Sequence, residues 1–169
     1  MFHDLFFSKS KSKVPKPCPI ALSTRVRLAR NLSEFPFPGR AESGQKKAVL
    51  SKCMSALGKV KPLQSCTSVE LDELSELDRQ ILVEKHLISL ELSQSDESGG
   101  VVLSNDRACS VMVNEEDHLR IQVLANGLDF SKVWKLADSL DSGIESSLDY
   151  AFDSQLGFLT ACPTNLGTG

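Results

Sequence analysis

Residues 101–125, VVLSNDRACSVMVNEEDHLRIQVLA, decide the fold class. Three runs rich in β-branched and aliphatic residues, at 101–105, 108–114 and 119–125, are typical of short β-strands. Only a few polar residues separate the runs. Connections this short join antiparallel neighbours, because parallel strands need a crossover of a dozen or more residues. The stretch therefore predicts an antiparallel sheet.

Two segments ahead of this stretch have helical periodicity. Over about 43–60, apolar residues recur at helical spacing, and Gly58 and Pro62 mark the end of the pattern. A second amphipathic helix is predicted over about 72–85, with charged residues on its outer face. Its apolar stripe consists of Leu74, Leu77, Ile81 and Leu82.

A third helix is predicted after the strands. Asp129 is placed to cap it, and apolar residues continue at helical spacing from Val133 to Ala151. Residues 157–160, GFLT, predict one further strand. Strands with helices packed to one side indicate an α+β fold, a two-layer α/β architecture in which helices flank an antiparallel sheet.

The composition is that of one globular domain preceded by a flexible leader. With 169 residues, 41% of them hydrophobic, the chain can bury one core. Residues 1–19 are the predicted leader, because the Ser, Lys and Pro of 8–19 bury too little surface to offset the entropy of ordering. Residues 20–169 are the predicted domain, and it begins with a short extended segment and a loop around FPFPGR.

Charge and cysteine content exclude several classes of protein. A net charge of −3, from 19 basic and 22 acidic residues, provides no general surface for nucleic acid. Five cysteines without a C-x-x-C pair argue against a disulfide framework, and neither cysteines nor histidines predict a metal site. No secretory signal and no apolar run of about 20 residues is present, so a cytoplasmic protein without membrane contact is expected.

The first candidate site is STRVR, residues 23–27. Side chains alternate along an extended segment, so Arg25 and Arg27 project to the same face. Two adjacent guanidinium groups offer bidentate donors to the oxygens of a polyphosphate. A solvated basic strand edge would show the same pattern.

The second candidate site is the run of three acids that follows the strand at 108–114. Glu115, Glu116 and Asp117 concentrate like charge, which costs stability unless cations or a cationic substrate balance it. A carboxylate can hold a planar guanidinium bidentately and accept a proton from its attacking nitrogen. Arg120, four residues beyond Glu116, could then face phosphate. A charged turn with internal ion pairs is the alternative.

The third candidate site is the loop CPTNLGTG, residues 162–169. Its glycines permit close backbone approach to a ligand, although it lacks the G-K-[ST] ending of a phosphate-binding P-loop. Cys162 could be a polarised thiol near a substrate, but a lone cysteine is more often a buried small hydrophobe. His86, at the exit of the second predicted helix, indicates little on its own.

Four strings, in this order, resemble the phosphagen (ATP:guanidino) kinase family: LSTRVRLARN, LVEKHLIS, SVMVNEEDHLRIQ and DYAFDSQLGFLTACPTNLGTG. NEEDHLR and CPTNLGT together are highly specific, and LVEKHLIS with CPTNLGTG points to the bacterial protein arginine kinase branch. Kinases of small guanidines carry a helical domain ahead of this region. Here only 22 residues precede Ser23, which suggests an open site for a protein-borne arginine.

The resemblance implies the glutamine-synthetase-like catalytic domain of guanidino kinases, with ATP as phosphoryl donor and Mg²⁺ bound through its phosphates. The implied ATP contacts are Ser23, Thr24, Arg25, Val26, Arg27, His86 and Arg120. Glu116 would orient and deprotonate the substrate guanidinium with Glu115 as its assistant, and Cys162 would match a reactive cysteine that tunes the substrate site. The implied partners are proteins bearing arginine, and the implied full-length form is a homodimer.

Family sequences continue beyond this chain with further phosphate-binding arginines and a mobile substrate loop. We therefore expect 20–169 to be the N-terminal part of the catalytic domain, and the isolated chain to be inactive or nearly so. The predicted function is phosphoryl transfer from ATP to arginine residues in proteins. Two alternatives are a non-catalytic nucleotide-binding or partner-binding module from a truncated gene, and a kinase of small guanidino compounds.

Overall fold

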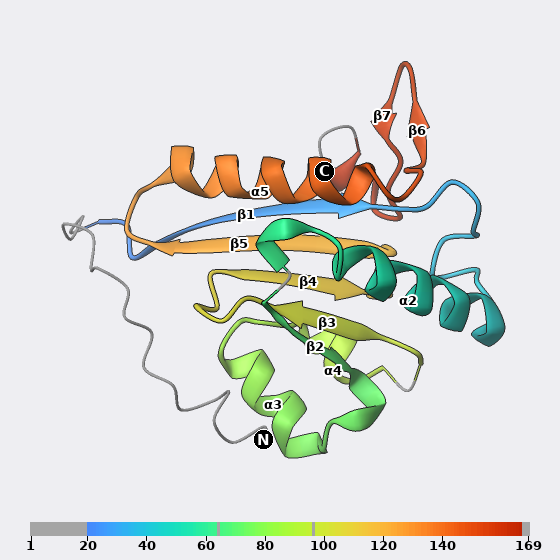
Figure 1. Cartoon of the computed structure of the whole chain (residues 1–169), viewed down its shortest axis with the longest axis horizontal. Helices are drawn as coiled ribbons and strands as arrows, with labels where there is room; N and C mark the ends of the chain where they lie inside the picture. The colour runs from blue at the N-terminus through green and yellow to red at the C-terminus, as the bar shows by residue number, and fades with distance from the viewer. Residues whose placement is uncertain (1–19, 64, 96, 167–169) are drawn as a thin grey trace.

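A five-stranded antiparallel sheet forms the centre of the computed structural model, which describes residues 20–63, 65–95 and 97–166 (Figure 1). The strand order is β1-β5-β4-β3-β2. The strands are β1 (Ser23–Arg30), β2 (Thr67–Glu70), β3 (Gly100–Leu103), β4 (Cys109–Val113) and β5 (Leu119–Asn126). The α+β class and the three strands predicted at 101–125 are confirmed. The predicted leader at 1–19 and the end of the predicted loop at 167–169 lie outside the described residues.

β1 is longer than the predicted extended segment. It pairs with β5 along its whole length, from Ser23 opposite Asn126 to Arg30 opposite Leu119. Over most of β1, exposed and buried side chains alternate, because one face of this edge strand packs on the core. The sequence does not predict β2, since Val69 is the one buried residue among its four and the run carries little apolar pattern.

Two helices, α2 (Ser43–Leu57) and α5 (Phe130–Glu145), cover one face of the sheet. Their buried residues form one apolar cluster with the inward side chains of β1, β4 and β5. Asp129 caps α5 as predicted. The predicted continuation of this helix to Ala151 is wrong, because α5 ends at Glu145; the residues beyond stay partly in the core as a loop.

A second apolar cluster lies on the opposite face and covers β2, β3 and β4. It includes residues of α3 (Glu76–Glu84) and α4 (Leu90–Ser93). The helix predicted over 72–85 begins only at Glu76, where Ser75 caps it, and Leu77 of its predicted apolar stripe is exposed. Helices therefore flank both faces of the sheet, and no residue of β1 or β5 belongs to this second cluster.

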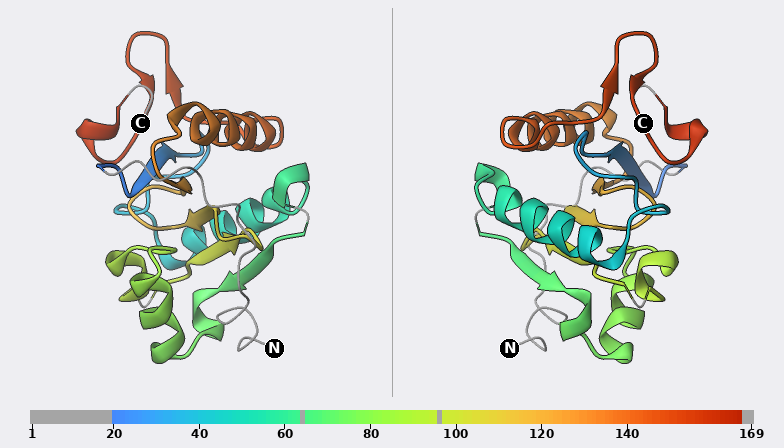
Figure 2. Two further views of the ribbon diagram at one scale, coloured as in Figure 1. Left: turned by 90° about the vertical axis from the view of Figure 1, so that its left-hand side faces the viewer. Right: turned by 90° about the vertical axis from the view of Figure 1, so that its right-hand side faces the viewer.

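A short hairpin follows α5. β6 (Phe152–Asp153) pairs with β7 (Gly157–Phe158) in a separate two-stranded sheet, which stands clear of the main sheet in Figure 2. The strand predicted at 157–160 is thus two residues long and does not join the main sheet. None of the helices in the described ranges is long and apolar enough to cross a membrane.

Arg30 joins this hairpin to the core. Its guanidinium carbon lies 3.8 Å from the centre of the Phe158 ring, and its Nε and Nη2 donate to the Asp141 carboxylate at 3.1 and 2.6 Å. Arg30→Ala would leave a largely buried carboxylate without its cation. We therefore expect it to lower the free energy of unfolding by about 3 kcal/mol in urea denaturation.

Lys52→Ala is the control for this prediction, because it breaks an exposed ion pair with Glu34. That variant should lose less than about 1 kcal/mol. Equal losses from the two substitutions would contradict the anchoring role of Arg30.

Candidate active site

Three arginines share the part of the sheet face that β1 and β5 form. Arg25 and Arg27 alternate with core residues of β1, so their side chains point away from α2 and α5. Residues paired across antiparallel strands point to one face, and Ala29 opposes Arg120, so Arg120 lies on this face too. Burial, and next the positive charges of Arg25 and Arg120, lower the pKa of the Arg27 guanidinium. A bound anion would relieve this repulsion.

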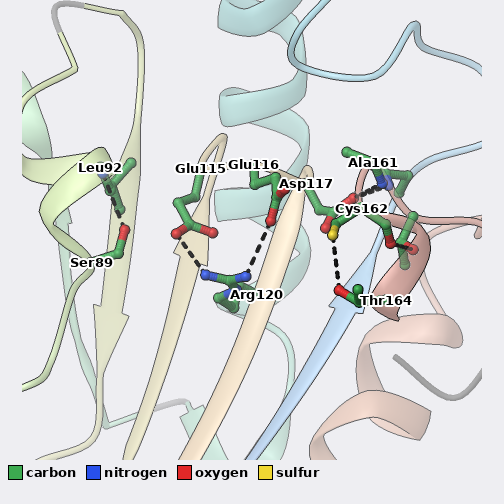
Figure 3. Close-up of polar contacts among 11 residues, drawn as sticks. Ser89, Leu92, Glu115, Glu116, Asp117, Arg120, Ala161, Cys162 and Thr164 are labelled. Carbon is green, nitrogen blue, oxygen red and sulfur yellow. Dashed lines mark hydrogen bonds and ion pairs between the residues drawn. The ribbon is translucent and has the colours of Figure 1, made fainter. Parts of the chain in front are cut away.

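The acidic turn, residues 114–118, lies beside Arg120 (Figure 3). Arg120 Nη1 donates to Glu115 Oε1 at 2.7 Å, and its Nη2 lies 3.4 Å from Glu116 Oε2. The Glu115 side chain is 2% exposed, and its Oε2 has no hydrogen-bond partner within the described part of the chain. The Glu116 side chain is 46% exposed. Glu115 therefore fixes Arg120, whereas Glu116 is available to a ligand.

Asp117 and His118, the last two residues of the turn, support its shape. Asp117 is fully buried and turns toward the backbone of Ala161. His118 Nδ1 accepts from the backbone N–H of Leu32 at 3.0 Å, so the ring donates through Nε2 to the carbonyl of Pro36. Burial lowers the pKa of His118, which keeps the ring neutral. The three consecutive acids thus point to three different environments.

His86 lies at another part of the open face. It follows α3 with φ +58°, and its carbonyl accepts from Gln122 Nε2 at 2.7 Å. A hollow of about 450 Å³ is lined by Ser23, Arg25, His86 and Leu124. The sequence motifs do not single out Gln122. Its position two residues beyond Arg120, on the same face of a strand, is the signal that would have found it.

Not every predicted ATP contact presents its side chain to this face. Val26 packs in the core, and the Thr24 hydroxyl donates to the carbonyl of Gly127 at 2.6 Å. Of the predicted stretch, Ser23, Arg25 and Arg27 lie on the open side, and Thr24 and Val26 offer it only their backbone.

A cleft of about 530 Å³ opens between α4 and the acidic turn. Its polar lining includes Arg27, Ser89, Glu91, Glu115, Glu116 and Arg120. Ser89 accepts from the backbone N–H of Leu92 at 3.1 Å and so caps α4. The sequence motifs assign no role to Ser89, the last residue of LVEKHLIS, or to Glu91, because the tertiary contacts of the short helix α4 bring both to this cleft.

Cys162 also lies near the acidic turn (Figure 3). Its Sγ is 2.9 Å from Thr164 Oγ1, and the preceding N–H of Ala161 donates to Asp117 Oδ1 at 2.6 Å. The thiol is partly exposed at the start of a 3₁₀ turn, Pro163–Asn165. Over the described ranges, no group of three His, Cys, Asp or Glu side chains could hold a metal ion.

Residues 48–169 match the family described as ATP:guanido phosphotransferase, C-terminal catalytic domain. The chain belongs to this family. It is 49% identical over 153 residues to the protein-arginine kinase of Symbiobacterium thermophilum, and 48% identical over 153 residues to that of Moorella thermoacetica. Each match covers 89% of this chain but only 43% and 44% of the relative. The chain thus spans less than half the length of these two protein-arginine kinases.

Solved structures of guanidino kinases share the fold. The duplicated taurocyamine kinase from Schistosoma mansoni with bound transition state analog components has a TM-score of 0.84 at 28% identity, covering 99% of this chain and 25% of that one. Lombricine kinase has a TM-score of 0.75 at 22% identity, covering 88% of this chain and 45% of that one. The antiparallel sheet flanked by helices is therefore the guanidino kinase fold that the sequence predicts.

The pKa of His118 predicts a pH-dependent stability. Because burial holds this pKa below the ordinary value of 6.5, the unfolded state binds the proton more tightly. The contribution of neutral His118 to the free energy of unfolding is complete above pH 6.5 and is lost as the pH falls below that value. We expect the urea concentration at the unfolding midpoint to be lower at about pH 5.5 than at about pH 7. The difference between the two pH values should be smaller in His118→Gln. Identical pH slopes would contradict this assignment.

Proposed function

We propose that this chain forms part of an enzyme that phosphorylates arginine residues of proteins with ATP. The observation that carries the proposal is the shared face on which three arginines adjoin the exposed carboxylate of Glu116. Phosphoryl transfer to a guanidinium requires both subsites, cations for the polyphosphate and a carboxylate for the guanidinium. The relatives named protein-arginine kinase favour a protein-borne arginine over a small guanidino compound.

The ATP subsite lies along the open face. Arg25, Arg27 and Arg120 hold the phosphates as charged donors, and the lowered pKa of Arg27 fits a site that gains from an anion. Ser23, His86 and the backbone of Thr24 and Val26 complete the contacts with ATP. Mg²⁺, bound through the phosphates, neutralises their charge.

The guanidinium subsite lies at the acidic turn. Glu116 holds the planar guanidinium and accepts the proton that its attacking nitrogen loses. Glu115 assists by holding Arg120 in place, and Cys162 tunes the guanidinium environment. The γ-phosphoryl group then transfers in line: its bond to the β,γ-bridging oxygen breaks, ADP leaves, and a bond to the guanidinium nitrogen forms, driven by alignment and by neutralised phosphate charge.

The proposed activity is that of the whole enzyme, of which residues 20–169 supply the N-terminal part of the catalytic domain after a leader at 1–19. Its substrates are proteins bearing arginine, its full-length form is a homodimer and its location is the cytoplasm. The described residues provide one carboxylate wall and one arginine face. Transition-state clamps from outside them would each contribute orders of magnitude in rate.

A non-catalytic nucleotide-binding or partner-binding module is the second candidate. β1 is the terminal strand of the described sheet, and such an edge can pair with a strand of another polypeptide. Calorimetric titration of the chain with Mg-ATP, with and without the downstream half, separates the candidates. Binding without phosphorylation favours the module, and no binding in either mixture rules it out.

Glu116→Gln tests the proposed carboxylate directly. The full gene product, incubated with ATP and an arginine-rich protein, should form acid-labile phosphoarginine, and Glu116→Gln should lower the rate by at least about 100-fold because the proton acceptor is lost. Mass spectrometry and acid lability identify the product.

The control for this experiment is Glu73→Gln, an exposed carboxylate outside the cleft, which should leave the rate unchanged. Phosphorylation of free arginine or creatine in place of the protein would contradict the protein-borne substrate. Full activity of Glu116→Gln would contradict the role of Glu116.

A further inference from the structure

Asn31 connects three segments at the end of β1, and its side chain is fully buried. Its Oδ1 accepts from the backbone N–H of His118 at 2.9 Å. Its Nδ2 donates to Asp117 Oδ1 at 2.5 Å and to the carbonyl of Leu159 at 3.1 Å. One amide thus contacts both the acidic turn and the segment that leads to Cys162.

Asp117 extends this connection. The same Oδ1 that accepts from Asn31 also accepts from the backbone N–H of Ala161, at 2.6 Å, and Ala161 directly precedes Cys162. The other oxygen, Oδ2, has no hydrogen-bond partner in the described part of the chain. A fully buried carboxylate is costly unless hydrogen bonds satisfy it, so its orientation depends strongly on these two donors.

The Cys162 loop, residues 159–166, depends on Asn31 and Asp117 for its position relative to the acidic turn. The loop follows the small β6-β7 hairpin and is not part of the main sheet. Apart from its bonds to Asn31 and Asp117, the described hydrogen bonds of residues 159–166 are internal, such as Thr160 Oγ1 to the Cys162 carbonyl, or run to Ala151. The bond from Ala161 to Asp117 is the described hydrogen bond between loop and turn.

We propose that Asn31 is a positioning residue, which orients Asp117 and thereby fixes the Cys162 loop against the turn that carries Glu116. The inference rests on the proposed function, because it assigns the guanidinium to the space between Glu116 and Cys162. Asn31 does not touch the substrate. Asn31 affects the separation between Glu116 and Cys162, and misplacement of a reacting group by about 1 Å can cost about 100-fold in rate.

Hydrogen exchange of single amides, followed by NMR, tests the connection without turnover. In Asn31→Ala, protection of the His118 and Ala161 amides should fall at least about tenfold. The His118 N–H loses its acceptor, Asn31 Oδ1, and the Ala161 N–H keeps an acceptor, Asp117 Oδ1, that Asn31 no longer orients. Asp117→Asn keeps an oxygen acceptor, so Ala161 protection should fall less and His118 protection should stay. Leu57→Ala, a buried change in α2, should not single out these two amides.

Two outcomes of this exchange experiment would overturn the proposal. One is unchanged protection of Ala161 in Asn31→Ala. The other is an equal loss at Ala161 and at strand amides such as Val111, which would indicate general destabilisation. If Asn31→Ala does not fold, unchanged protection of Ala161 in Asp117→Ala, which removes the acceptor, overturns it.

Kinetics of the full gene product test the consequence. Asn31→Ala should raise KM for an arginine peptide about tenfold while KM for ATP stays within about twofold, because the arginine face is untouched. Equal changes in both constants would contradict positioning of the guanidinium subsite. The exchange result stands on its own, so an enzyme without arginine kinase activity would refute the proposed function and leave the connection measurable.

Discussion

Repulsion among three guanidinium groups, balanced by a buried carboxylate, is the constraint on which the site depends. Arg25, Arg27 and Arg120 share one face, and burial, followed by the charges of Arg25 and Arg120, lowers the pKa of Arg27. Glu115, 2% exposed, is the fixed counter-charge, and it holds Arg120 at 2.7 Å. Because the ion pairs of this face, from Glu115 and Glu116, both go to Arg120, and none within the described residues involves Arg25 or Arg27, the face retains an attraction for a polyanion.

The division of the sheet makes this face accessible. Val101, Leu103 and Met112 on β3 and β4 are buried under the second apolar cluster, whereas the neighbouring β5 and β1 carry polar side chains on the same side. The second apolar cluster ends near His86, whose carbonyl accepts a hydrogen bond from Gln122 Nε2. One sheet face therefore supplies both a packed region that stabilises the domain and a polar region that binds.

Local pattern predicts the parts of the structure that local forces determine. The β-branched runs of β3 to β5, the apolar stripe of α2 and the cap at Asp129 all follow from neighbouring residues, and each is confirmed. The sequence does not predict β2 or α4, because each has only four residues and forms through tertiary contacts. The end of α5 escapes as well, because its apolar spacing continues into a buried loop.

The candidate site shows the same limit. Strand alternation predicts the shared face of Arg25 and Arg27 and places Arg30 on the opposite side, but it cannot reveal the Asp141 and Phe158 partners that bury Arg30. Likewise, three consecutive acids cannot reveal that Asp117 serves Asn31, since that contact spans 86 positions in the chain. Partners distant in sequence decide which charged residues bind ligand and which hold the fold.

The central claim is that the arginine face binds the phosphates of ATP. NMR of the guanidinium Nε–H groups during titration with Mg-ATP tests it most directly. The account predicts that Arg25, Arg27 and Arg120 shift together and saturate at one concentration, while Arg40, exposed before α2, does not shift. Shifts that are absent, or equal at Arg40, would contradict it.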